Sequence, residues 1–280
     1  GVKVAMFITD PKYKATISEE EAKELDASIF NYSYGNEAVG YNLTFHWAVD
    51  KHSDTVVKSR FTYEGVPSGI AVNHIMALLF THKTMAEIST ISYAALERLL
   101  RDNPKIEALP FAESYAITFG IDAARLAVKA YTKQLLTHEE TTIPCKDSPM
   151  SIASIKESIR LHNIQTLDEA AAYTKAGSSD ASCREKLLEW IEENKNAVAE
   201  KEAAESALTA VPFREMSPDH RIIAVETAID NTIRQFLVMD GGDIDILSVK
   251  EKGDQFEVYI SYLGACSSCD SSGTGTLMAI

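Results

Sequence analysis

The spacing of hydrophobic positions separates strand-like from helix-like segments in the first half of the chain. Residues 40–64 alternate between apolar and polar side chains on both sides of a polar turn, which predicts a β-hairpin. Apolar residues then recur at helical spacing over 70–80, 89–100 and 115–136. A small sheet followed by packed helices predicts an α+β domain that ends near residue 135.

The second half of the chain divides into three further segments. Residues 143–192 have the pattern of short helices joined by loops, and 196–215 is expected to be a linker that follows a solvated helix rich in Glu, Lys and Ala. The last segment, 216–280, is expected to begin with a helix capped by Ser217 before Pro218, followed by a β-hairpin, a cysteine-containing loop and a second helix. The predicted fold class is therefore α+β.

Composition places the chain among soluble globular proteins and excludes two classes of partner. Hydrophobic residues make up 45% of the chain, and its formal net charge is −14. This acidity argues against nucleic acid and against an anionic membrane surface, since both need basic patches. No apolar run approaches the roughly 18 residues of a membrane-spanning helix. Gly1 is not an initiator Met, and Ile280 ends a helical pattern without a cap, so we expect residues to be missing at both ends.

Four cysteines are too few for a secreted disulfide scaffold and favour a reducing cytoplasm. Cys266 and Cys269 form a C-x-x-C sequence between a strand pattern and the start of a helix, where N–H groups stabilise thiolates. From the residues alone, three interpretations stay open: a metal or iron–sulfur site, a redox dithiol, or an inert pair. A second copy of the chain would complete the four thiolates that a cluster takes.

The sequences "MDGGDIDILSVK" and "YISYLGACSSCDSSGTGTL" resemble the C-terminal domain of the NifU family over roughly 217–280. The D-G-G-D turn and the C-x-x-C stand at the separation found in that family. The resemblance implies a 4Fe–4S cluster that bridges a homodimer, with Cys266 and Cys269 of each chain as ligands. It also implies transfer of the cluster to apo iron–sulfur client proteins. No bond-forming catalysis is implied, so we do not expect an enzyme.

Upstream, the chain is similar to the full three-part NifU architecture. "EAVGYNLTFHWAVD", "FTYEGVPSGIAVNHIM" and "LPFAESYAITFGIDAARLAVKAY" are similar to the segments of an IscU-like scaffold that carry its ligands. Laid over those patterns, the three scaffold cysteines fall at Val39, Val66 and Ala116, the aspartate at Tyr41 and the histidine at Tyr115. We therefore expect 1–135 to keep the scaffold fold without assembling a cluster there, and to serve dimerisation or docking.

The resemblance also gives 143–192 a ferredoxin-like 2Fe–2S site in which each cysteine pair has lost one member. The family pattern is C-x-C, a helical span and C-x-x-C, and its four positions are occupied by Cys145, Asp147, Asp180 and Cys183. We expect that the 2Fe–2S site is lost and that the two cysteines are leftovers. The alternative is a mixed thiolate and carboxylate site, a donor set that suits zinc or iron.

Two hypotheses for the function follow from this resemblance, beside the redox dithiol. The first is a cytoplasmic iron–sulfur cluster assembly and carrier protein that uses Cys266 and Cys269. The second is a cysteine-depleted pseudo-scaffold that acts as an interaction or regulatory partner of the cluster-assembly machinery, for example by occupying a cysteine desulfurase. His46 and His74 show no ligand spacing and are expected to be packing or surface residues.

Overall fold

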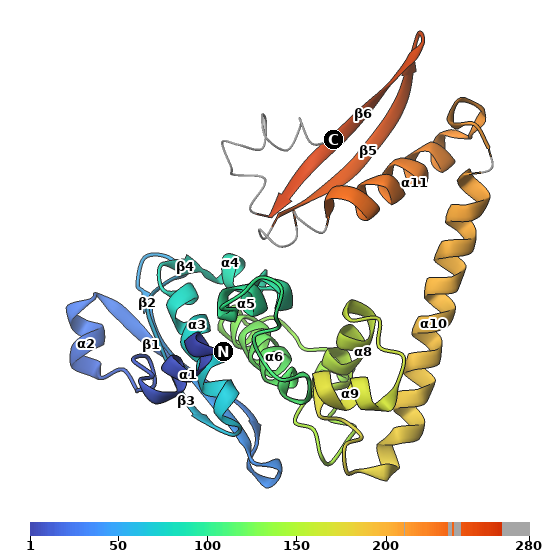
Figure 1. Ribbon diagram of the computed structural model, residues 1–280. Coiled ribbons are helices and arrows are strands. Elements are labelled where there is room, and N and C mark those ends of the chain that lie inside the picture. Colours follow the sequence, from blue (N-terminus) through green and yellow to red (C-terminus); the bar gives the residue numbers. More distant parts are fainter. Residues whose placement is uncertain (210, 235–236, 238–241, 265–280) are drawn as a thin grey trace. The chain divides into compact units, whose positions relative to one another are not determined.

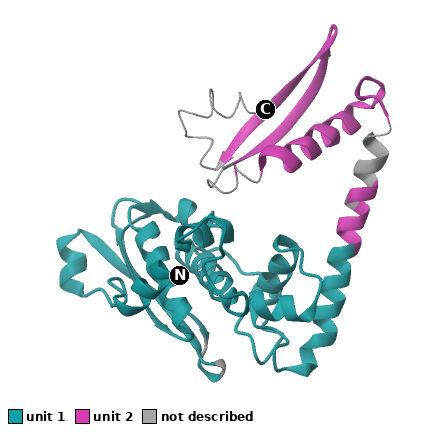
Figure 2. Cartoon of the chain, viewed as in Figure 1, with its two compact units in different colours: residues 1–195 teal, residues 196–280 magenta. Residues whose placement is uncertain are grey.

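The computed structural model describes residues 1–209, 211–234, 237 and 242–264. The chain falls into two compact units, residues 1–195 (unit 1) and residues 196–280 (unit 2), shown in separate colours in Figure 2. Helices combine with antiparallel sheets, which confirms the α+β fold class. None of the helices in the described ranges is long and apolar enough to cross a membrane.

The sheet of unit 1 has four antiparallel strands in chain order (Figure 1). They are β1 (Ala27–Asn36), β2 (Tyr41–Asp50), β3 (Thr55–Glu64) and β4 (Lys83–Thr84). Strands β2 and β3 form the predicted hairpin, and Leu43, Phe45 and Trp47, the alternate apolar residues of β2, are all fully buried. The alternation therefore identifies the face of the sheet that packs in the core.

Helices cover the buried face of this sheet. The helices of this region are α1 (Val2–Thr9), α2 (Glu19–Glu24), α3 (Pro67–Phe80), α4 (Met85–Ser89), α5 (Tyr93–Leu100), α6 (Tyr115–Tyr131) and α7 (His138–Thr141). Helices α3 and α6 pack on each other and on the sheet, and they correspond to two of the predicted helices. The predicted helix at 89–100 corresponds to α5, which begins later than predicted because Ser92 caps the Ala95 N–H.

Three helices follow, namely α8 (Ile152–Leu161), α9 (Leu167–Thr174) and α10 (Ala181–Thr209). Thr166 caps α9 in a capping box with Glu169, in agreement with the sequence pattern. Helix α10 continues through residues 196–209, the first part of the expected linker, because Glu, Lys and Ala are good helix formers and no Gly or Pro lies between Gly177 and Pro212. The proposed domain boundaries stay a prediction.

An aromatic cluster joins α8 and α9 to the scaffold-like part of unit 1. The His162 ring stacks on Tyr173 with the ring centroids 3.9 Å apart, and Tyr93 meets both rings edge-on. Phe111 contacts Tyr173 from the short 3₁₀ helix Phe111–Glu113. These contacts join α8 and α9 to the part of unit 1 that contains the sheet.

Unit 2 contains a helix packed on a β-hairpin. Helix α11 (Pro218–Ile229) begins after Ser217, whose side chain caps the His220 N–H, and a π-helical turn (Asp230–Arg234) follows it. The hairpin is β5 (Gly242–Lys252) and β6 (Gln255–Gly264), joined where Gly253 has a positive φ. Helix α11 packs against β5, and Ile229, Ile244 and Val249 are buried. The predicted capped helix and hairpin are confirmed.

Candidate functional site

The C-x-x-C pair follows directly on the hairpin of unit 2. Cys266 and Cys269 lie outside the described residues, so their geometry stays a prediction. Strand β6 ends at Gly264, two positions before Cys266. The described hairpin therefore supplies the element that leads into the cysteine loop.

Arg234 fastens the end of the helical segment to the start of this hairpin. Its guanidinium forms ion pairs with Asp230 and Asp243, and its Nη1 donates to the carbonyl oxygen of Ile244 over 2.9 Å. Asp243 is the second aspartate of the D-G-G-D turn. Because guanidinium binds a carboxylate and a carbonyl with a fixed planar geometry, these contacts hold the start of β5 against the end of the helical segment.

In unit 1, the structure brings together two of the residues that stand at scaffold ligand positions. Tyr41 begins β2 and Tyr115 begins α6, and their hydroxyl oxygens lie 2.7 Å apart in a buried hydrogen bond. Burial, together with the hydrogen bond to Tyr41, raises the pKa of Tyr115 above its usual value. The Tyr115 phenol is therefore neutral, and a neutral phenol is a poor iron ligand compared with a carboxylate or an imidazole.

The remaining scaffold positions have no metal-binding chemistry either. Ala116 is buried in α6, and Val66 packs against the core at the N-terminal end of α3. Val39 belongs to a short 3₁₀ helix, Glu37–Val39. Alkyl side chains offer iron no lone pair, so this site cannot hold a cluster on its own residues.

Tyr63 fills the remaining space beside these positions. Its ring lies so close to α3 that a Cβ on Gly69 would stand 2.2 Å from the Tyr63 hydroxyl oxygen. This hydroxyl is buried, and burial raises the Tyr63 pKa. Tyr63 also contacts the Phe119 ring, with the centroids 6.5 Å apart. Aromatic packing thus occupies the place where the resemblance puts a ligand site.

A cavity of about 480 Å³ connects this region with the central part of unit 1. Its lining consists of Ala38, Tyr41, Lys146, Asp147, Lys175, Ser178, Ser179 and Asp180. Lys175, in the left-handed conformation with φ +67°, ends α9 and places its Nζ 5.1 Å from the centroid of the Tyr115 ring. The central helices therefore cover the scaffold-like site with a cationic side chain.

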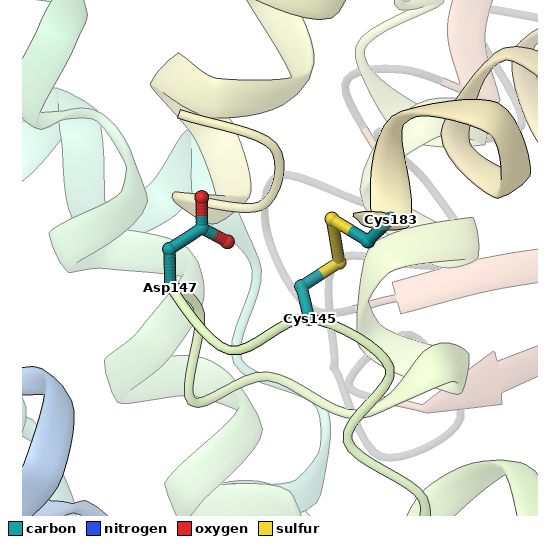
Figure 3. Close-up of side chains that lie close together, drawn as sticks. All are labelled: Cys145, Asp147 and Cys183. Carbon is teal, nitrogen blue, oxygen red and sulfur yellow. A yellow bond between two sulfur atoms is a disulfide. The ribbon is translucent and has the colours of Figure 1, made fainter. Parts of the chain in front are cut away.

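Cys145 and Cys183 form a disulfide in the central part of unit 1 (Figure 3). Their Cα atoms lie 5.4 Å apart, and both residues are at most 3% exposed. The bond joins the loop before α8 to the first turn of α10. Of the four predicted ligands, Cys145, Asp147 and Cys183 have ligand atoms within 4.8 Å of one another, and Asp180 is not part of that group.

Both carboxylates of this region are held by hydrogen-bond donors. Asp147 accepts hydrogen bonds from the N–H groups of Ser179 at 2.6 Å, Asp180 at 2.7 Å and Gly177 at 3.2 Å. Burial raises the pKa of Asp147, but these donors outweigh burial and hold the pKa below its usual value. Asp180 accepts from the Lys146 N–H at 2.8 Å and from the Ser182 N–H at 2.9 Å.

These contacts do not fit the 2Fe–2S cluster that the resemblance places here. Such a cluster takes four thiolates, whereas two of the four positions hold carboxylates and the two sulfur atoms are bonded to each other. The loss of this 2Fe–2S site stays a prediction, which the two carboxylates and the disulfide support. Binding of another metal by the mixed set stays a prediction.

Three residues of this neighbourhood are absent from the predicted sites, namely Tyr63, Asp122 and Lys175. The Tyr34 hydroxyl donates a hydrogen bond to the carboxylate of Asp122, and burial raises the Asp122 pKa. A polar residue in the helical pattern of 115–136 is a weak signal for Asp122. For Tyr63 and Lys175 no local signal exists, because their roles depend on contacts between segments distant in sequence. His46 and His74 are buried, as expected for packing residues.

Comparisons with known proteins agree with the resemblance at both ends of the chain. The model of the NifU-like N terminal domain matches residues 2–138, and that of the NifU-like domain matches residues 225–280. The nitrogen fixation protein NifU of Trichormus azollae is 27% identical over 98% of this chain and 91% of its own length. The NifU protein of Azospirillum brasilense is 30% identical over 51% of this chain and 50% of its own length. The chain belongs to the NifU family of iron–sulfur cluster assembly proteins.

Proposed function

We propose that this chain carries a 4Fe–4S cluster on Cys266 and Cys269 of two copies and transfers it to apo iron–sulfur proteins in the cytoplasm. One observation carries the proposal. The chain has four cysteines, and Cys145 and Cys183 are consumed in the disulfide. The C-x-x-C is therefore the one pair left that can supply thiolates, and it lies within the part matched by the NifU-like domain.

The cysteine count supports a homodimer. A 4Fe–4S cluster takes four thiolate ligands, and each chain supplies two from this loop. A two-fold axis through the cluster places the same two residues of each chain at the shared site. The cluster is cargo in this account, and the protein holds and delivers it without making or breaking bonds in a substrate.

The scaffold-like site supports the view that this chain accepts clusters but does not assemble them. Tyr41, Tyr63 and Tyr115 occupy it, so a cluster carried by this chain would be assembled elsewhere. The chain would then accept a finished cluster at Cys266 and Cys269. Arg234 and the hairpin would orient the receiving loop.

A second candidate function rests on the same scaffold-like site, whose ligand positions hold tyrosine and alkyl side chains. A domain with the scaffold fold but without its thiols could bind a cysteine desulfurase and receive no sulfur, which would make the chain a regulatory partner of the assembly machinery. The buried Tyr41–Tyr115 contact favours this role, because it removes sulfur-accepting chemistry and keeps a packed fold.

Anaerobic reconstitution with ferrous iron and sulfide tests the carrier proposal. We expect about four iron atoms per pair of chains in the unmodified protein. The Cys266→Ser/Cys269→Ser variant should bind none, and the matched Cys145→Ser/Cys183→Ser variant should keep its iron. Iron that persists without Cys266 and Cys269 would contradict the carrier proposal.

The second function is tested with the Cys266→Ser/Cys269→Ser variant and a purified cysteine desulfurase. Tight binding that slows sulfur delivery to an intact scaffold protein would support the regulatory role. Absence of binding would contradict it. If the unmodified protein binds the desulfurase but no iron, the regulatory role replaces the carrier role.

A further inference from the structure

The loop from Gly177 to Asp180 is folded around the carboxylate of Asp147. Its N–H groups at Gly177, Ser179 and Asp180 all point at one side chain, and the Ser178 hydroxyl adds a contact of 3.2 Å. Converging backbone N–H groups make a cavity for an anion, the arrangement that also surrounds phosphates and iron–sulfur clusters. In this chain the anion is part of the protein.

A second set of contacts ties the same two segments together in the opposite direction. Asp180 accepts from the Lys146 N–H. Within the second segment, the Arg184 Nε donates to the Gly177 carbonyl oxygen over 3.0 Å. The loop before α8 and the loop before α10 thus exchange hydrogen bonds through both aspartates. Neither carboxylate needs a metal ion to satisfy it.

The disulfide completes this connection on the buried side. Cys145 and Cys183 are 38 positions apart in the sequence, and the bond between them closes a chain segment that includes α8 and α9. Cross-linking positions so far apart restricts the unfolded chain strongly. Since both cysteines are nearly inaccessible to solvent, thiol–disulfide exchange at this bond requires local opening of the folded unit.

We infer that the central part of unit 1 is a metal-free module. The Cys145–Cys183 disulfide and the N–H-bonded carboxylate of Asp147 hold it together. Oxidation of the two cysteines stabilises this module in place of a metal. The bond forms by exchange with a low-molecular-weight disulfide such as glutathione disulfide. One S–S bond of the reagent breaks and one forms in the protein. The two cysteine protons leave with the two molecules of released thiol, so that atoms and electrons balance.

The test uses the full chain with Cys266→Ser and Cys269→Ser, so that its outcome does not depend on cluster binding at the C-terminal loop. After exposure to glutathione disulfide, titration in denaturant should find no free thiol, and dithiothreitol should then expose two per chain. Melting in dithiothreitol should lower the Tm by about 10 °C. Zinc or ferrous iron added to the reduced protein should leave this lower Tm unchanged.

Two results would overturn the inference. One is stoichiometric binding of zinc or iron by the reduced protein with recovery of the Tm, which would show a metal site. The other is a Tm that does not depend on oxidation. If a Cys145→Ser/Cys183→Ser variant fails to fold, the comparison with and without dithiothreitol on the intact pair supplies the same answer.

The role of Asp147 has its own variant and control. Asp147→Asn keeps the size of the side chain but replaces one acceptor oxygen with a donor, and should lower the Tm in both the oxidised and the reduced protein. Glu189→Gln removes an exposed carboxylate of α10 in the same unit and should leave the Tm within about 1 °C. Equal Tm values for Asp147→Asn and Glu189→Gln would overturn the assignment of Asp147 as the anion of this loop.

Discussion

The hydroxyl groups of Tyr41 and Tyr115 are hydrogen-bonded to each other, 2.7 Å apart, at the two positions where the family resemblance places an aspartate and a histidine. At these two ligand positions the side chains now bond to each other, and each hydroxyl has the other as its hydrogen-bond partner. This relationship explains how the scaffold-like part keeps a packed core after its ligands are gone. It also gives a sharp prediction, because the two hydroxyls depend on each other.

We expect Tyr41→Phe and Tyr115→Phe each to lower the free energy of unfolding by about 1 to 2 kcal/mol, since each leaves a buried hydroxyl without its partner. The double variant should cost less than the sum, because both polar groups are then removed. Urea unfolding of the four proteins measures this coupling. A double variant that costs the full sum would show that the two hydroxyls act independently.

Lys175, whose side chain covers the scaffold-like site, provides a second test. It adopts a left-handed backbone conformation that disfavours side chains with a Cβ, and its ammonium group lies over the Tyr115 ring. Lys175→Ala keeps the unfavourable conformation and loses the cation contact, whereas Lys175→Gly relieves the conformation. We expect the Gly variant to be more stable than the Ala variant by about 1 kcal/mol in urea unfolding. Equal stabilities would contradict the left-handed helix end at this residue.

His162 makes the stability of unit 1 depend on pH. Burial lowers the pKa of His162 from 6.5 to about 4. The unfolded state therefore binds a proton at His162 more readily than the folded state does. The contribution of the neutral imidazole to the free energy of unfolding is complete above about pH 6.5 and is lost as the pH falls toward 4. We expect the decrease in Tm between pH 7 and pH 5 to be smaller in His162→Phe, which preserves the ring stacking on Tyr173.

A matched control for this experiment is His52→Gln, because the His52 side chain is 81% exposed. It should follow the pH dependence of the unmodified protein. If His162→Phe and the unmodified protein lose the same Tm between pH 7 and pH 5, the buried imidazole is not a source of the acid sensitivity.

Arg234 joins the end of the helical segment to the start of the hairpin that precedes the proposed cluster loop in the sequence. Replacing it with Ala removes its contacts with Asp230, Asp243 and the Ile244 carbonyl. We expect Arg234→Ala to shorten the lifetime of the reconstituted cluster several-fold, measured as iron release to a chelator, with no change in the number of free thiols. Arg214→Ala serves as the control, because Arg214 is about half exposed and binds at the other end of the hairpin. Equal iron release from both variants would contradict a positioning role for Arg234.

The sequence predicts those parts of the fold that depend on local pattern. The hairpin of β2 and β3, helix α3 and the caps at Thr166 and Ser217 all follow from alternation, helical spacing or capping residues. Strand β1 is absent from the prediction, although Phe30, Tyr32 and Tyr34 alternate with polar or small residues and would have indicated it.

The central site shows where such prediction ends. The positions of Cys145, Asp147, Asp180 and Cys183 are visible in the sequence, but their partners are not. Whether two cysteines 38 positions apart bind a metal or each other depends on the distance between their Cα atoms, which the packing of α8 and α9 determines. The convergence of three N–H groups on Asp147 likewise depends on the path of a loop.

Native mass spectrometry of the anaerobically reconstituted protein tests the carrier account most directly, because it counts chains, iron and sulfide in a single particle. The account predicts two chains with one 4Fe–4S cluster for the unmodified protein, and single chains without iron for the Cys266→Ser/Cys269→Ser variant. A cluster bound to a single chain, or a cluster that persists in that variant, would contradict it.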